Sequence, residues 1–126
     1  MDISSFESKE HTFELVNPVD ESGLGWHFTL RSPDSDEVRK VERDWQNKRL
    51  ARRKMTLTAE SIEAGGDAKI QAAVTGWRFD EGSSFEGGKP EFSSTKLREI
   101  IRNPKYRWIR NQLDQELGDA SSFFTN

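Results

Sequence analysis

Histidines are the first residues to consider for catalysis or metal binding, and this sequence has only two. His11 and His27 both fall in or beside predicted strands, and neither has a carboxylate or a second histidine at ligand spacing. Such residues are more often surface histidines on a strand than ligands. The chain has no cysteine, which excludes disulfides, thiolate chemistry and thiolate-bound metals. We therefore expect no metal site and no bound cofactor.

The serines and glycines of the sequence form no recognisable catalytic or phosphate-binding motif. No serine stands in a G-x-S-x-G pattern, the turn that presents the nucleophile of many hydrolases. Gly65-Gly66 and Gly87-Gly88 lack the context of a phosphate-binding loop, since Lys89 is followed by Pro90 rather than by serine or threonine. The sequence therefore predicts a protein that is not an enzyme and has no catalytic residue.

Charge is distributed unevenly along the 126 residues. Residues 1–37 carry nine acidic and two basic residues, a net charge of −7, whereas residues 39–54 carry eight basic and two acidic residues, a net charge of +6. The basic run at 48–54 is a candidate surface for a nucleic acid or an acidic protein, or simply a solvated helix end whose cations complement the helix dipole. The residues that we expect to contact a protein partner are Arg49, Arg52, Arg53 and Lys54. A total charge of −3 and the lack of a recognised nucleic-acid-binding motif argue against nucleic acid.

Two half-buried strands are predicted near the N-terminus. Residues 12–17 alternate between apolar and polar side chains, and so do residues 26–31. The connection between them is rich in turn-forming residues, so the two strands form a hairpin. Because a two-stranded hairpin is marginal in water by itself, its apolar face must pack on other elements.

Two helical stretches are predicted after the hairpin. Asp34 caps the first, with Glu37 placed to complete a capping box, and this helix runs to about Lys54. The second occupies residues 58–76 and is interrupted or ended at Gly65-Gly66. Its buried face is predicted to be Ile70, Val74 and Trp77.

A loop over residues 78–92 precedes the last two helices. Its phenylalanines at 79, 85 and 92 are expected to hold it against the body. Ser93 or Ser94 begins a short helix, and Asn103-Pro104 is typical of a cap followed by the first helical residue. The final helix has a stripe at Ile109, Leu113 and Leu117 and ends at Gly118.

The fold class that follows is α+β and mainly α-helical, with an N-terminal two-stranded β-hairpin packed on a small helical bundle. We expect a single domain over residues 1–126, divided into the hairpin (1–32), the helical part (34–118) and a mobile tail (119–126). Trp45, Trp77 and Trp108 are expected to converge in one core. In the tail, Phe123 and Phe124 either fold back onto the core or offer a partner an apolar contact. No stretch approaches the ~18 apolar residues of a membrane span, so no membrane partner is expected.

The second half of the chain resembles a known family. Residues 72–80 (AAVTGWRFD) are followed by Phe85, by residues 90–93 (PEFS) and by Leu97. Further positions of the pattern are Trp108-Ile109-Arg110, Leu113-Asp114, Gly118-Asp119 and Phe123-Phe124. Over about residues 57–126, this pattern is similar to that of the tail assembly chaperones of long-tailed bacteriophages and prophages.

The resemblance implies a role in assembly. Chaperones of this family bind the tape measure protein in the bacterial host cytoplasm and keep it soluble. They also recruit tail tube subunits, which replace them, so the chaperone is absent from the mature virion. The two oppositely charged segments independently predict self-association, with the basic helix end of one copy against the acidic part of the next, unless the helix folds back on its own hairpin.

Two other functions remain open at this point. One is a small nucleic-acid-binding regulator that uses the basic helix 48–54, which steeply salt-dependent binding to duplex DNA would identify. The other is a structural tail or head-to-tail accessory protein that stays in the particle, which mass spectrometry of purified virions would detect.

Overall fold

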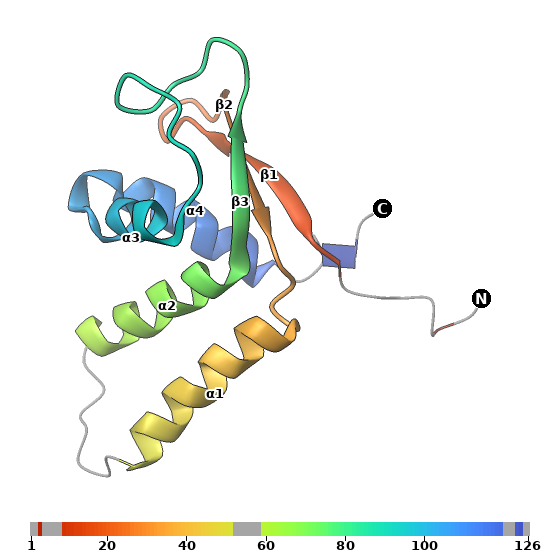
Figure 1. Ribbon diagram of the computed structural model, residues 1–126, viewed down its shortest axis with the longest axis vertical. Coiled ribbons are helices and arrows are strands. Elements are labelled where there is room, and N and C mark those ends of the chain that lie inside the picture. The colour runs from red at the N-terminus through yellow and green to blue at the C-terminus, as the bar shows by residue number, and fades with distance from the viewer. Residues whose placement is uncertain (1–2, 4–8, 52–58, 120–122, 125–126) are drawn as a thin grey trace.

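The computed structural model describes residue 3 and residues 9–51, 59–119 and 123–124 of the chain (Figure 1). Two strands come first and are followed by two helices, a third strand and two more helices. In chain order the elements are β1 (His11–Val16), β2 (Gly23–Leu30), α1 (Asp36–Ala51), α2 (Ala59–Ala73), β3 (Val74–Phe79), α3 (Ser94–Arg102), the 3-10 turn η2 (Pro104–Tyr106) and α4 (Arg107–Gly118). The α+β class is confirmed. No described helix is long and apolar enough to cross a membrane.

The sheet has three antiparallel strands in the order β1-β2-β3, where the sequence predicted a hairpin of two. Residues 74–76 were expected to continue a helix and residues 78–79 to begin a loop, and both predictions were wrong, because residues 74–79 form the strand β3. Trp77 pairs with Phe28 and Phe79 pairs with Trp26, so alternate residues of β3 extend the apolar face of β2. The spacing of Ile70, Val74 and Trp77 fits a helix face, but the backbone of Val74 and Trp77 pairs with β2 instead.

The helices α2, α3 and α4 lie on one side of the sheet, and α1 extends from the end of the sheet alongside α2 (Figure 1). The buried residues on this side form one core, which the β1–β2 side chains Leu15, Trp26, Phe28 and Leu30 share with helical residues including Leu97, Ile109 and Leu113. The predicted stripe of α4 is therefore confirmed as core-facing. The other face of the sheet carries polar side chains, among them Thr12 and Thr29, whose hydroxyl oxygens are 2.9 Å apart.

Aromatic rings hold the long loop against the sheet. The ring centroid of Trp26 lies 5.4 Å from that of Trp77 and 4.8 Å from that of Phe85. Trp77 also contacts Phe92 edge-on at 5.0 Å, and its indole N–H donates to the Pro90 carbonyl at 2.8 Å. The predicted anchoring of the loop by its phenylalanines is confirmed.

The expected convergence of three tryptophans is only partly correct. Trp77 and Trp108 both pack against the core, but the indole that meets Trp77 belongs to Trp26. Trp45 lies instead at the contact between α1 and α2, next to Gly65. The buried side of α1 joins the common core through Val38, whereas Trp45 on the same side faces α2.

Two predicted helix signals differ in the structure. Ser35, rather than Asp34, caps α1, because the Ser35 hydroxyl accepts from the Val38 N–H at 3.4 Å. The helix α2 continues through Gly65-Gly66 without a break. By contrast, the predicted caps of the later helices are confirmed: Ser93 accepts from Lys96 N–H at 3.0 Å and Asn103 accepts from Lys105 N–H at 3.0 Å.

Candidate functional site

The predicted basic surface lies where α1 ends. Arg49 occupies a position in the last turns of α1, and Arg52, Arg53 and Lys54 lie outside the described residues. Whether these four cations form one surface therefore remains a prediction. The rest of the helix is described.

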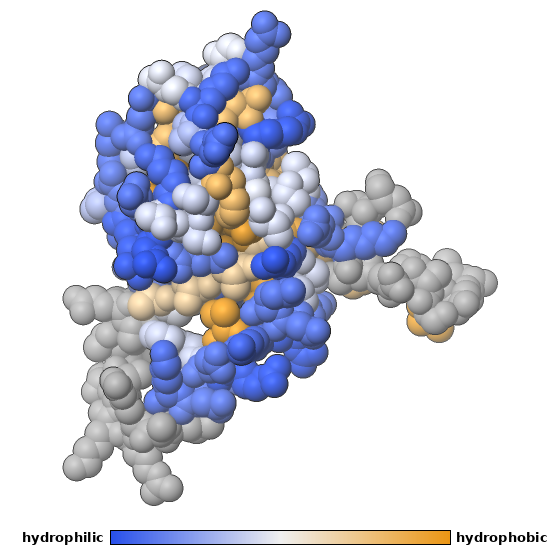
Figure 2. All heavy atoms as spheres, in the orientation of Figure 1, coloured by the Kyte–Doolittle hydropathy of each residue, from blue (hydrophilic) through white to orange (hydrophobic). Residues whose placement is uncertain are grey.

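The helix α1 forms an arm that packs chiefly against α2. Its Val38 is fully buried, while Val41 and Trp45 are half-buried. Figure 2 shows the polar surface of α1 set off from the main body, with hydrophobic atoms along the seam between them. The Glu42 carboxylate binds the Lys69 ammonium across this seam at 2.8 Å. One side of α1 is thus packed against α2, and exposed side chains among its described residues, including Arg39, Lys40, Arg43 and Asp44, face solvent.

Gly65 and Gly66 explain how α2 fits between α1 and α4. A Cβ at Gly65 would lie 2.8 Å from the indole nitrogen of Trp45, and a Cβ at Gly66 would lie 2.8 Å from a guanidinium nitrogen of Arg110. Arg110 Nε donates to Asp67 Oδ1 at 2.6 Å, and its Nη2 donates to the Glu63 carbonyl at 3.3 Å. The glycine pair therefore permits close helix contacts on both sides of α2.

The two C-terminal phenylalanines have different environments. Phe123 is only 1% exposed, its ring meets the His11 ring edge-on at 5.6 Å, and its carbonyl accepts from the Lys9 N–H at 2.7 Å. Phe124 is 45% exposed. Of the two alternatives for this pair, folding back thus applies to Phe123, whereas Phe124 is exposed and its contact with a partner stays a prediction. Mobility of the tail as a whole stays a prediction.

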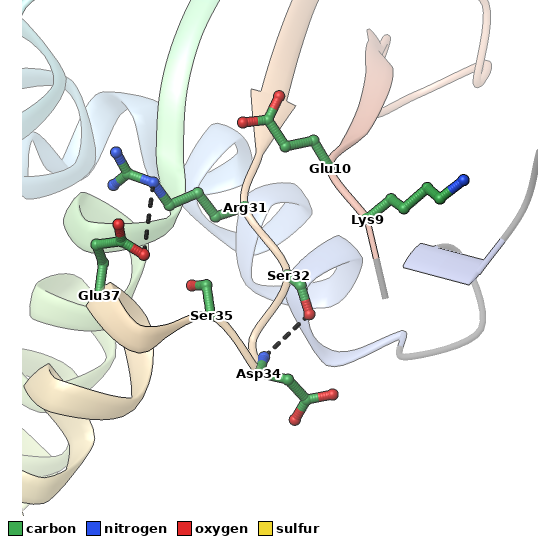
Figure 3. A pocket seen from close by; sticks show the side chains of 7 residues that line it. All are labelled: Lys9, Glu10, Arg31, Ser32, Asp34, Ser35 and Glu37. Carbon is green, nitrogen blue, oxygen red and sulfur yellow. Dashed lines mark hydrogen bonds and ion pairs between the residues drawn. The ribbon is translucent and has the colours of Figure 1, made fainter. Parts of the chain in front are cut away.

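A hollow of about 340 Å³ lies where β2 leads into α1 (Figure 3). Its lining is polar and of mixed charge: Lys9, Glu10, Arg31, Ser32, Asp34, Ser35 and Glu37. The Arg31 guanidinium donates to the Ala72 carbonyl at 2.9 Å and lies 4.0 Å from the Glu37 carboxylate. The Ser32 hydroxyl accepts from Asp34 N–H at 3.0 Å. These interactions shape the start of α1, and the lining contains no histidine that would activate a serine.

The fold gives both histidines carboxylate neighbours that are distant in the sequence. His27 Nε2 is 3.0 Å from Asp80 Oδ2 and 4.0 Å from Glu14 Oε2, on the polar face of the sheet. His11 Nε2 is 3.1 Å from Glu116 Oε2. No carboxylate stands at ligand spacing from either histidine in the sequence. Strand pairing and helix packing bring the imidazoles and carboxylates together in the folded chain.

Hydrogen bonding favours the ionised form of the Asp80 carboxyl. The bond from His27 lowers the pKa of the Asp80 carboxyl below its ordinary value, and Arg78, which donates to Asp80 Oδ1 at 2.8 Å, lowers it further. The Glu14 carboxylate is oriented by the Gly25 N–H, which donates to its Oε2 at 2.9 Å. These side chains form an ordered, charged cluster on the open face of the sheet.

Comparisons of the chain with protein-family models, with curated proteins and with solved structures found no match. A functional hypothesis therefore depends on the residues and on their arrangement.

Proposed function

We propose that the protein is a non-enzymatic tail assembly chaperone of a long-tailed bacteriophage or prophage. It binds the tape measure protein in the bacterial cytoplasm, keeps it soluble, recruits tail tube subunits and leaves before the virion is complete. The resemblance over residues 57–126 motivates this function. The structural observation that carries the proposal is the α1 arm, because exposed side chains such as Arg39, Lys40 and Arg43 are available to contact another chain.

The free surface of α1 suits a polar, reversible contact. Its exposed side chains carry both signs, including Arg39, Lys40 and Arg43 beside Asp36 and Asp44. A helical partner lying along the arm would find complementary charges and, at the half-buried Trp45, a limited apolar contact. Polar contacts of this kind favour fast association and a modest affinity. A chaperone that tube subunits later displace requires both properties.

The positions that carry the family resemblance have a structural role in this fold. Trp77, Phe79 and Phe85 surround Trp26, and Phe92 packs on Trp77. The pattern therefore specifies the aromatic core that holds the loop on the sheet. Contacts with the partner fall to surfaces outside this core, of which the α1 arm and Phe124 are the two that we propose.

The experiment is co-expression of the full chain with the tape measure protein encoded beside it, followed by measurement of how much tape measure protein stays soluble. We expect wild type to keep it soluble and the triple variant Arg39→Glu, Lys40→Glu, Arg43→Glu to lose most of that effect. The matched control reverses three exposed cations near α3, at Arg98, Arg102 and Lys105, and should behave as wild type.

Three results would contradict the proposal. The first is tape measure protein that is equally insoluble with and without the wild-type chain. The second is detection of the chain in purified virions, which would indicate a structural tail protein. The third is tight binding to duplex DNA with a steep salt dependence, which would indicate a nucleic-acid-binding regulator.

A further inference from the structure

Glu14, His27 and Asp80 form a cluster whose members lie on or directly beside all three strands of the sheet. Glu14 is the cross-strand partner of His27 on β1, and Asp80 directly follows the end of β3. The three side chains stand on the sheet face opposite the helices. The His27 side chain is 16% exposed, whereas those of Glu14 and Asp80 are 39% and 47% exposed. A partly buried imidazole is thus flanked by two carboxylates whose exposed side chains can still change their orientation.

The distances match the space that a metal ion needs. Three ligand atoms bound tetrahedrally at ~2.1 Å stand about 3.4 Å apart. His27 Nε2 lies 3.0 Å from Asp80 Oδ2 and 4.0 Å from Glu14 Oε2, and the three ligand atoms all lie within 4.8 Å of one another. Small rotations of the two exposed carboxylates would therefore bring all three atoms into the coordination shell of one ion.

Neighbouring groups already orient these ligands. The Gly25 N–H holds the Glu14 carboxylate, and Arg78 binds Oδ1 of Asp80 and leaves Oδ2 facing the imidazole. Hydrogen bonds of this kind to metal-binding side chains are a regular feature of metal sites. Asp80 Oδ2 and His27 Nε2 now share one hydrogen bond, so a bound ion would take the place of that proton.

We propose that Glu14, His27 and Asp80 form a binding site for a divalent transition-metal ion of the Zn²⁺ class. One imidazole and two carboxylates suit Zn²⁺, Co²⁺ or Ni²⁺ better than Mg²⁺ or Ca²⁺, which prefer all-oxygen ligands. The ion would connect β1, β2 and β3 through one atom from each of three chain segments. Its fourth position would face solvent. The cation Arg78 beside the site limits the affinity.

The first test is calorimetric titration of ZnCl₂ into the full chain after treatment with a chelator. We expect one equivalent to bind, and the variant His27→Gln to bind at least tenfold more weakly. His11→Gln is the matched control, because His11 also lies beside a carboxylate, at 3.1 Å from Glu116, but has no second one among the described residues. Its affinity should stay within twofold of wild type. Thermal unfolding of wild type should shift upward as Zn²⁺ rises, because the ion binds the folded sheet.

A second measurement needs no variant. Paramagnetic Co²⁺ added to the wild-type chain should broaden the amide NMR signals of residues 14, 27 and 80 first, and equimolar Mg²⁺ should leave them unchanged. The proposal is overturned by no Zn²⁺ binding at 1 mM ion, by equal binding in wild type and His27→Gln, or by broadening centred on His11. In any of those cases the three side chains form an ion-pair cluster alone.

Discussion

Arg110 on α4 donates to Asp67 on α2 across 2.6 Å, and both side chains are only 11% exposed. Gly66, one residue before Asp67, leaves the space that the guanidinium occupies. Arg110 also reaches the Glu63 carbonyl, so one side chain connects α4 to two successive turns of α2. This contact and the Trp45–Gly65 contact position α2 between the body and the arm.

Removing Asp67 should therefore destabilise the fold. The Asp67→Ala variant leaves the Arg110 charge largely buried without its partner, and such a loss costs about 3 kcal/mol of unfolding free energy. Urea denaturation measures the change. The control is Glu42→Ala, which breaks the more exposed Glu42–Lys69 pair between α1 and α2 and should cost less than ~1 kcal/mol. Equal losses of unfolding free energy in the two variants would show that the Asp67–Arg110 pair stabilises the fold no more than the exposed pair does.

Gly65→Ala should destabilise the protein although alanine favours helices by ~1 kcal/mol over glycine. The added methyl would lie 2.8 Å from the Trp45 indole nitrogen, so Trp45 must move and α1 must loosen. Overpacking of this kind costs about 1–3 kcal/mol. Gly118→Ala, which has open space around it, is the helical control and should not destabilise the fold. Adding Trp45→Ala to Gly65→Ala should remove the penalty, as a double-mutant cycle by denaturation would measure.

Substitutions of the two C-terminal phenylalanines should have different effects, one on stability and the other on partner binding. Phe123→Ala empties a buried site and should cost about 3–5 kcal/mol. Phe124→Ala should leave the melting temperature nearly unchanged, because that ring is 45% exposed, yet should weaken capture of the tape measure protein. Thermal denaturation and co-purification of the two variants side by side provide the comparison. A Phe124→Ala chain with full capture would remove this residue from the binding surface.

Asp80 should make stability depend on pH in the acid range. Its folded pKa lies below the ordinary value of 3.8, chiefly because of the His27 hydrogen bond. The unfolded carboxyl therefore takes up a proton first, and the contribution of Asp80 is present above pH 3.8 and lost as pH falls through the folded pKa. NMR titration of the Asp80 carboxyl in chelator should show its pKa rising toward 3.8 in His27→Gln. An unchanged pKa would mean that Arg78 dominates.

Self-association should weaken as salt rises if the opposite charges of residues 1–37 and 39–54 meet between copies. Surface charges are screened over about 10 Å at 0.1 M salt. Light scattering from 0.05 to 1 M NaCl should show a decreasing mass for wild type and a small mass throughout for the variant Arg49→Glu, Arg52→Glu, Arg53→Glu. A monomer under every condition would support the alternative that the helix pairs with its own hairpin.

Several features of the fold follow from the sequence because they depend on neighbouring residues. The alternation in β1 and β2 and the caps at Ser93 and Asn103 all operate within a few residues. The buried stripe of α4 is also local, since residues four apart share one helix face. The sequence by itself thus determined the hairpin, the last two helices and the core-facing side of α4.

Tertiary structure alone decided the remaining features, because their partners are far away along the chain. Residues 74–79 form a strand since β2 provides an apolar edge to pair with, and that pairing outweighs a helical spacing. Gly65 and Gly66 lie within the helix α2, although glycine pairs often end helices. Side chains at these two positions would occupy the space that Trp45 and Arg110 fill. His27 meets Asp80 across 53 positions, which only the register of the sheet determines. Local patterns contain no information about such distant contacts, so the polar cluster and the arm emerged only from the folded chain.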